Sequence, residues 1–124
     1  MNLSILRLLV GLSILQFIVI HLLQITSINY HAIVGTHMLI GFIILILSYV
    51  TMFVFKKKYG NCFGATALSG AITLQFIIGV IFYLPSSPVS LEPILRLLHL
   101  IIGLTVLSLA VALRVRFTHQ SNSK

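Results

Sequence analysis

The sequence predicts an all-α integral membrane protein, a four-helix bundle built from two repeated transmembrane hairpins. Hydrophobic residues make up 59% of the 124 residues and charged residues only 7%. A soluble domain of this length cannot bury that much apolar surface, so the composition requires a bilayer. Three long stretches, 8–55, 59–91 and 97–113, contain no Asp, Glu, Lys or Arg. Two pairs of apolar segments also resemble each other, which indicates the repeat.

Each predicted helix follows from these uncharged stretches, because a spanning helix needs roughly 20 mostly apolar residues. The four helices are expected at about 6–26, 32–55, 63–84 and 92–115. "TSINY" (26–30) divides the first stretch into two spans, and "KKKYGN" (56–61) and "LPSSPVS" (84–90) bound the third. No small-residue cleavage site follows the first helix, so we expect it to be retained as a span. All of residues 1–124 are expected to form one domain.

The distribution of basic residues predicts the orientation of the bundle. With both termini in the cytoplasm, the inner side carries seven of the eight Lys and Arg residues: Arg7, Lys56, Lys57, Lys58, Arg114, Arg116 and Lys124. Only Arg96 then lies on the outer side. The positive-inside rule favours this arrangement. The formal charge of +7 is thereby explained by topology and lipid headgroups without nucleic acid, and we expect a multi-pass protein of the cell (plasma) membrane.

The repeat is visible in two pairs of segments. "LQFIVI" (15–20) resembles "LQFIIG" (74–79), and "HMLIGFIILIL" (37–47) resembles "HLIIGLTVLSL" (99–109). Each hairpin would begin on the inner side, so the two repeats would be related by an axis along the membrane normal. Under that symmetry His37 and His99 are equivalent. Each lies about six residues into a helix that descends from the outer side, roughly 9 Å below the boundary.

Two imidazoles at one depth favour a haem site. Zinc would need further ligands, and no Cys or carboxylate is near; copper would need Cys or Met at positions where none is found. Haem iron needs only two axial ligands from the protein, and helix bundles commonly supply them from facing helices. Gly41 and Gly103 lie one turn deeper on the histidine face, where a glycine leaves room for a macrocycle. The alternative is that both histidines only form helix–helix hydrogen bonds and both glycines only permit close packing.

Other polar residues surround this candidate site. Arg96 lies one turn above His99 and is either the partner of a haem propionate or a plain interfacial charge. His21 lies near the outer end of the first helix and is a hydrogen-bond donor to the site, a substrate contact or a satisfied core histidine. Gln16 and Gln75 fall near mid-membrane and are expected to hydrogen-bond each other or backbone across the bundle.

The sequence resembles one four-helix half of the haem A synthases. The resemblance covers about residues 8–115 and rests on the histidine early in the second helix, "LQFIIG" (74–79) and "LHLIIGL" (98–104). It implies a compact single-half form, as in archaea, that pairs as an oligomer, with His37 and His99 at the family's ligand positions. The family usually has a Glu shortly before the helix 2 histidine and an Arg directly after it. Here Val34 and Met38 flank that histidine, so the acid linked to oxidation of the haem methyl group is missing.

These observations leave three functional hypotheses. The first is a b-type haem protein with His37 and His99 as axial ligands, which transfers electrons in or beside a respiratory oxidase complex. The second is a half-sized haem A synthase that oxidises haem O, in which case haem O or haem A would be bound. The third is a cofactor-free accessory membrane subunit whose histidines only pack. Because so short a chain shields a haem thinly, a homo-oligomer or a larger respiratory partner is expected.

Overall fold

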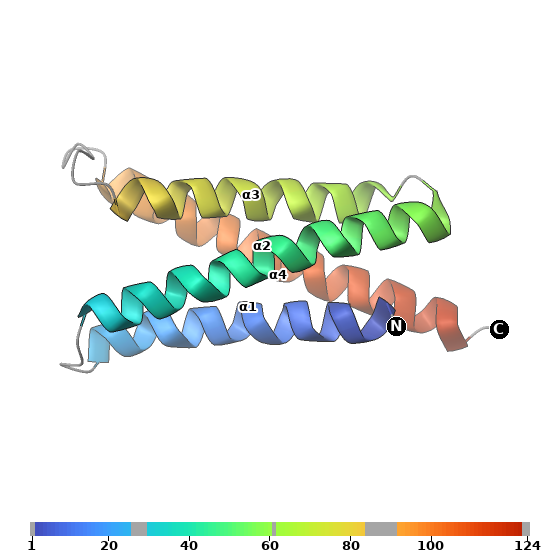
Figure 1. The fold of residues 1–124 in the computed structure, drawn as a ribbon, viewed down its shortest axis with the longest axis horizontal. Coiled ribbons are helices and arrows are strands. Elements are labelled where there is room, and N and C mark those ends of the chain that lie inside the picture. Colours follow the sequence, from blue (N-terminus) through green and yellow to red (C-terminus); the bar gives the residue numbers. More distant parts are fainter. Residues whose placement is uncertain (1, 26–29, 61, 84–91, 123–124) are drawn as a thin grey trace.

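The computed structural model describes residues 2–25, 30–60, 62–83 and 92–122, which are almost entirely helical (Figure 1). The helices are α1 (Asn2–Ile25), α2 (Tyr30–Tyr59), α3 (Phe63–Tyr83) and α4 (Glu92–Asn122). The number and order of the helices agree with the prediction. The predicted connections at 26–29 and 84–91 lie outside the described residues.

Helices α2 and α4 run past the ends that hydropathy predicts for them. Lys56, Lys57 and Lys58 form part of the last turn of α2, where lysine has good helix propensity and its charge complements the negative end of the helix dipole. Gly60 ends this helix with φ 74°, and its N–H donates to the Lys56 carbonyl over 3.0 Å. This is the left-handed glycine cap typical of helix C-termini.

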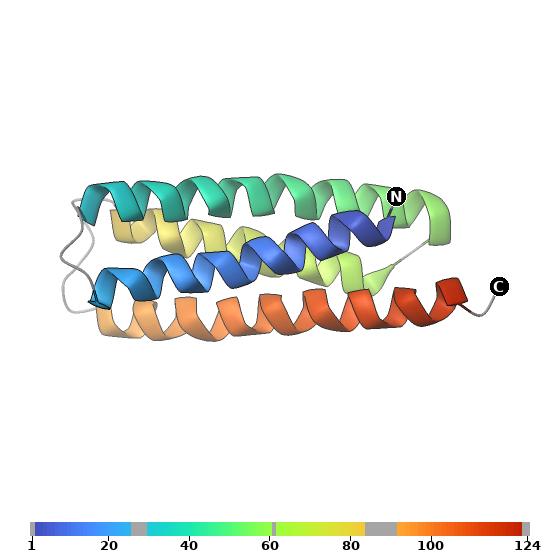
Figure 2. The ribbon, with the colours of Figure 1, turned by 90° about the horizontal axis from the view of Figure 1, so that it is seen from below.

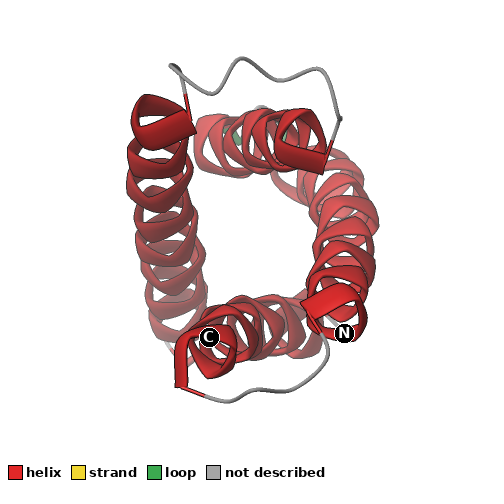
Figure 3. Ribbon diagram, turned by 90° about the vertical axis from the view of Figure 1, so that its left-hand side faces the viewer, coloured by secondary structure: helices red, strands yellow, loops and turns green. Residues whose placement is uncertain are grey.

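The four helices pack as a square in which each helix contacts two neighbours (Figures 2 and 3). The pairs α1–α2, α2–α3 and α3–α4 follow chain order, and α1 against α4 closes the ring. Among the described residues, α2 and α4 make no close backbone contact, because they occupy diagonal corners. Both chain ends lie at the same end of the bundle (Figure 1), together with the basic residues of 56–58.

Three of the helices have the length and hydropathy of membrane spans, which indicates a multi-pass membrane protein. The qualifying segments are His31–Tyr59, Phe63–Phe82 and Pro93–Thr118. In α1 the described apolar segment, Ser4–Ile20, is shorter. Large apolar side chains cover the outside of the bundle, for example Leu39 at 60% exposure and Phe53 at 63%. Such a surface is suited to lipid.

The core follows one seam along each helix, and the seams match between the hairpins. In α1 and α3 the buried positions 59 residues apart are Leu6 and Ala65, Leu9 and Leu68, Val10 and Ser69, and Ser13 and Ile72. In α2 and α4 the buried positions 62 residues apart are Ile44 and Val106, Ser48 and Ala110, Thr51 and Leu113, and Phe55 and Phe117. The same separations, 59 and 62 residues, relate the similar sequence segments of the first and second hairpins.

Aromatic rings close the core at the end of the bundle where the chain begins and ends. The rings of Phe55 and Phe117 meet edge to face with centroids 4.3 Å apart, and Tyr59 packs 5.0 Å from Phe117. The Lys58 ammonium lies 5.2 Å from the Tyr59 ring centroid, within the range of a cation–π interaction. Side chains of the two diagonal helices therefore meet at this end, and the histidine pair lies toward the other.

Candidate functional site

His37 of α2 and His99 of α4 face each other across the diagonal of the bundle. Their ring centroids are 6.2 Å apart and the ring planes are inclined by 56°. Each histidine lies seven residues after the first residue of its helix, Tyr30 or Glu92, about 10 Å along the axis. Both side chains are half-buried. The two histidines that the predicted repeat treats as equivalent thus lie together inside the protein.

A layer of glycine, glutamine and phenylalanine lies one turn from the imidazoles, and it has the same composition on both sides. A Cβ added to Gly41 would lie 3.2 Å from Gln16 Nε2 and 3.8 Å from Phe76. A Cβ added to Gly103 would lie 3.0 Å from Gln75 Nε2 and 3.4 Å from Phe17. Each glycine therefore faces the glutamine of its own hairpin and the phenylalanine of the other.

The space beside each glycine is thus taken by a glutamine amide and an aromatic ring. The sequence predicts that the two glutamines bond each other or backbone across the bundle. In the structure Gln16 Nε2 lies 3.4 Å from His37 Nε2. Gln75 Oε1 is buried and has no hydrogen-bond partner. Sequence patterning could not find Phe17 and Phe76, because a phenylalanine in an apolar helix carries no signal of its own.

Three buried polar atoms at this level of the bundle lack hydrogen-bond partners: His37 Nδ1, His99 Nδ1 and Gln75 Oε1. They are the only such side-chain atoms found in the described part of the chain. Buried polar groups in folded proteins are nearly always paired, so a cluster of unpaired polar atoms is a place where a water, an ion or a ligand could bind. Within the described residues, the buried polar atoms without hydrogen-bond partners therefore lie at and beside the histidine pair.

His99 has two further contacts that the sequence did not predict. Its ring lies edge to face with Phe82, with centroids 5.9 Å apart. A Cβ added to Gly79 of α3 would lie 3.3 Å from His99 Cε1, closer than most side chains tolerate. The position equivalent to Gly79 in the first hairpin is Ile20, so the two histidines have different neighbours.

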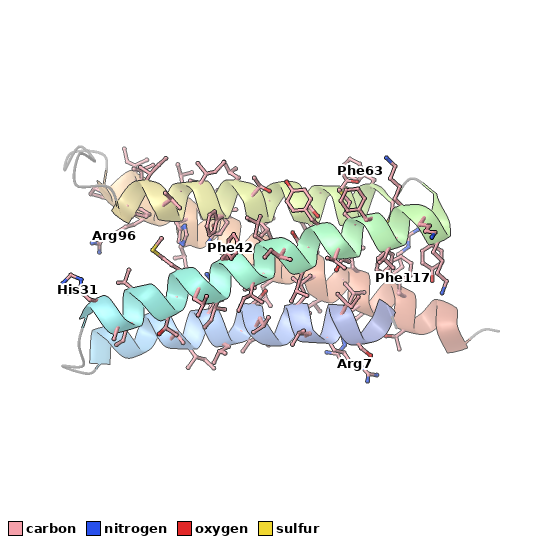
Figure 4. All side chains as sticks on the ribbon, viewed as in Figure 1. Arg7, His31, Phe42, Phe63, Arg96 and Phe117 are labelled. Atoms are coloured by element: carbon pink, nitrogen blue, oxygen red, sulfur yellow. The ribbon has the colours of Figure 1, made fainter. Side chains whose placement is uncertain are left out.

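The remaining predicted site residues are placed as follows. Arg96 lies one turn before His99 in α4 and is exposed, at the same end of the bundle as His31 (Figure 4). Arg7 lies toward the opposite end (Figure 4). The backbone of His21 belongs to α1, but its side chain lies outside the described residues.

The imidazole pair could supply two ligands to a metal. Among the described residues, no group of three or more His, Cys, Asp or Glu side chains could hold an ion, which leaves the imidazole pair. Two imidazoles that bind one metal from opposite sides, with bonds of about 2 Å, have centroids about 6 Å apart. The observed centroid distance of 6.2 Å matches that spacing. Haem is the common cofactor that needs only two imidazole ligands from the protein.

A shallow hollow elsewhere on the protein has a different character. It is lined by Val111, Arg114, Val115 and Thr118, which all belong to one face of α4. It lies more than two helical turns from His99 and holds none of the polar atoms discussed above.

No family model, curated protein or solved structure matches this chain.

Proposed function

We propose that this protein is a membrane-embedded b-type haem protein in which His37 and His99 are the two axial ligands. The single observation that carries the proposal is the imidazole pair, 6.2 Å apart, with an unpaired buried nitrogen on each ring. Iron coordination would satisfy one nitrogen of each ring. A haem held by two histidines supplies reversible one-electron chemistry, so we propose electron transfer in or beside a respiratory oxidase complex as the role.

The protein's own residues would shape this site in three ways. His37 and His99 hold the iron from diagonal helices, which fixes the distance between α2 and α4. The aromatic rings of Phe17, Phe76 and Phe82 lie near the imidazoles or their glycines and exclude water from them. Arg96, one turn before His99, is suited to pair with a propionate at the end of the bundle.

We also propose the finer topology. All four helices would span the bilayer, because α1 with 24 residues is about 36 Å long. Both termini would be cytoplasmic, since the basic residues of 56–58 lie at their end of the bundle. The matched burial of positions 59 and 62 residues apart supports an origin from two repeated hairpins. The haem would then lie in the outer half of a plasma membrane.

Membership of the haem A synthase family remains part of this proposal and rests on the sequence motifs. Oxidation of a haem methyl group is the less favoured activity, because the sequence contains one acid, Glu92, and its side chain lies outside the described residues. Val34 and Met38 stand where the family usually has Glu and Arg. Extraction of pigment after incubation with haem O tests this activity, and conversion to haem A would favour the enzyme over the electron carrier.

The proposed function is tested by purifying the protein in detergent from cells supplied with haem precursor. A reduced-minus-oxidised optical spectrum is expected to show sharp low-spin bands at about one haem per chain. His37→Ala and His99→Ala should each abolish these bands, and His31→Ala, at the exposed end of α2, is the matched control that should keep them. Purified protein without pigment that also fails to take up added haemin would contradict the proposal and favour a cofactor-free subunit.

A further inference from the structure

The end of the bundle that carries both termini has a surface hollow that the proposed haem site does not use. The hollow has a volume of about 290 Å³ and is lined by Val111, Arg114, Val115 and Thr118 of α4. Val111 and Val115 are 41% and 51% exposed, and Arg114 is exposed beside them. An apolar wall thus adjoins a guanidinium group. This combination complements a phospholipid, which has an acyl chain next to a phosphate.

Arg114 lies at the depth of a bilayer phosphate. It is 21 residues after Pro93, where the apolar span Pro93–Thr118 begins, and a helix of that length is about 32 Å long. The hydrocarbon core of a bilayer is about 30 Å thick. With α4 spanning the bilayer, Arg114 therefore reaches the boundary opposite Pro93, and Val111 lies one turn nearer the hydrocarbon.

A second arginine comes from α1 at about the same level. Gly103 of α4 faces Phe17 of α1, because a Cβ added to this glycine would lie 3.4 Å from the Phe17 ring. Arg114 is eleven residues after Gly103, and Arg7 is ten residues before Phe17. The two helices are antiparallel neighbours (Figure 1). Both arginines therefore lie toward the same end of the bundle, about 17 Å and about 15 Å from that contact.

Both arginines also lie on the side where α1 and α4 adjoin. Eleven residues are close to three whole turns, so Arg114 lies on nearly the same face of α4 as Gly103. Arg7 is nine residues, or two and a half turns, before Gln16, whose amide lies beside Gly41 of α2. Arg7 is therefore on the face of α1 turned away from α2. Side chains lean toward the N-terminus of their own helix, so these two lean toward each other's level.

No acidic side chain at this end competes for the two cations. The chain has a single Asp or Glu, Glu92, which is the first residue of α4 and belongs to the opposite end of the bundle. The Thr118 hydroxyl donates to the Arg114 carbonyl over 2.8 Å. Because that hydrogen is already used, contact with a phosphate falls to the guanidinium groups.

We propose that Arg7 and Arg114 flank a binding site for one anionic phospholipid, such as phosphatidylglycerol. Its phosphate pairs with the guanidinium groups, and an acyl chain lies against Val111. Basic pockets beside membrane-spanning helices are suited to anionic headgroups, and an arginine binds a phosphate through two parallel hydrogen bonds. The site is independent of haem and depends only on the helices spanning a bilayer.

Native mass spectrometry of the full-length protein in detergent micelles counts the bound lipids and measures their dissociation constants. The buffer is about 0.5 M ammonium acetate, which shortens the Debye length to about 4 Å and suppresses diffuse attraction. The wild type is expected to bind one phosphatidylglycerol about tenfold more tightly than phosphatidylcholine. Arg114→Gln and Arg7→Gln should each weaken that binding about tenfold, the loss of one charge-assisted hydrogen bond.

Arg116→Gln is the matched control. It removes the same charge from α4 at an exposed position, two residues after Arg114 and on nearly the opposite face of the helix. It should leave the affinity within about twofold of the wild type. Equal losses in Arg114→Gln and Arg116→Gln, or a wild type without preference for phosphatidylglycerol, would overturn the inference.

A soluble competitor separates a lipid site from a site for free phosphate. Glycerol 3-phosphate carries the phosphate without acyl chains, so it makes no contact with the apolar wall. At millimolar concentration it is expected to leave phosphatidylglycerol bound. Displacement of the lipid would contradict a phospholipid site and indicate one for a soluble phosphate instead.

Discussion

The rings of His37 and His99 lie with their centroids 6.2 Å apart, although they come from helices on opposite corners of the square. Side chains of the same two helices also meet at Phe55 and Phe117, whose ring centroids are 4.3 Å apart. The two pairs are separated by 18 positions in α2, about 27 Å along its axis. One end of the diagonal is thus closed by aromatic packing, and the other holds two imidazoles at a spacing suited to a shared metal.

The packed rings of Phe55, Tyr59 and Phe117 are expected to stabilise the fold without affecting the histidine pair. Phe55 is 1% exposed, so Phe55→Ala should leave a cavity and lower the free energy of unfolding by up to about 3 kcal/mol, the lower end for such a change in water. We use the lower end of the range because a phenylalanine of a membrane protein stays in an apolar environment on unfolding, so the substitution loses packing but little hydrophobic transfer free energy. Unfolding in mixed micelles of increasing denaturing detergent measures this.

Phe53→Ala is the matched control for that experiment. Phe53 lies on the same helix at 63% exposure and should change the unfolding free energy little. Both variants should retain the optical spectrum of the wild type. Equal destabilisation by the two substitutions would show that the Phe55 side chain is not part of a packed core.

Gly79 is expected to be required for the position of His99. In Gly79→Ala the new methyl group would lie 3.3 Å from His99 Cε1, so the ring must shift by a few tenths of an ångström. We expect weaker haem retention and a broadened low-spin signal in electron paramagnetic resonance. Gly70→Ala in the same helix meets nothing within 4 Å and should leave both unchanged. A Gly79→Ala protein that behaves like Gly70→Ala would mean that α3 does not constrain the ring.

The proposed orientation, with both termini cytoplasmic, predicts opposite accessibility at the two ends of the bundle. In a Cys62→Ser background, Lys57→Cys should react with a membrane-impermeant maleimide only after the membrane is opened, and Arg96→Cys should react in intact cells. The physical reason is the positive-inside rule, under which the lysines of 56–58 would lie on the cytoplasmic side. The reverse labelling pattern would invert the topology and place the histidine pair in the inner half of the bilayer.

Hydropathy was sufficient to predict the helices, and it was least informative where they end. The bilayer boundary and the helix end are different properties, so α2 continues through its three lysines to Tyr59 and α4 continues to Asn122. The proximity of His37 and His99 could be predicted because the proposed repeat places two residues of similar sequence context at the same level of the bundle. The contacts of Gly79 with His99, and of Phe17 with Gly103, could not, because they depend on how one hairpin packs against the other.

The most direct test of the central claim is chemical rescue of the axial ligands. His37→Gly and His99→Gly each remove one imidazole, and imidazole added to the solution can take its place on the iron. The account predicts that ferric protein loses its low-spin electron paramagnetic resonance signal in each variant and regains it with added imidazole. A low-spin signal that persists in either variant without added imidazole would contradict ligation by that histidine.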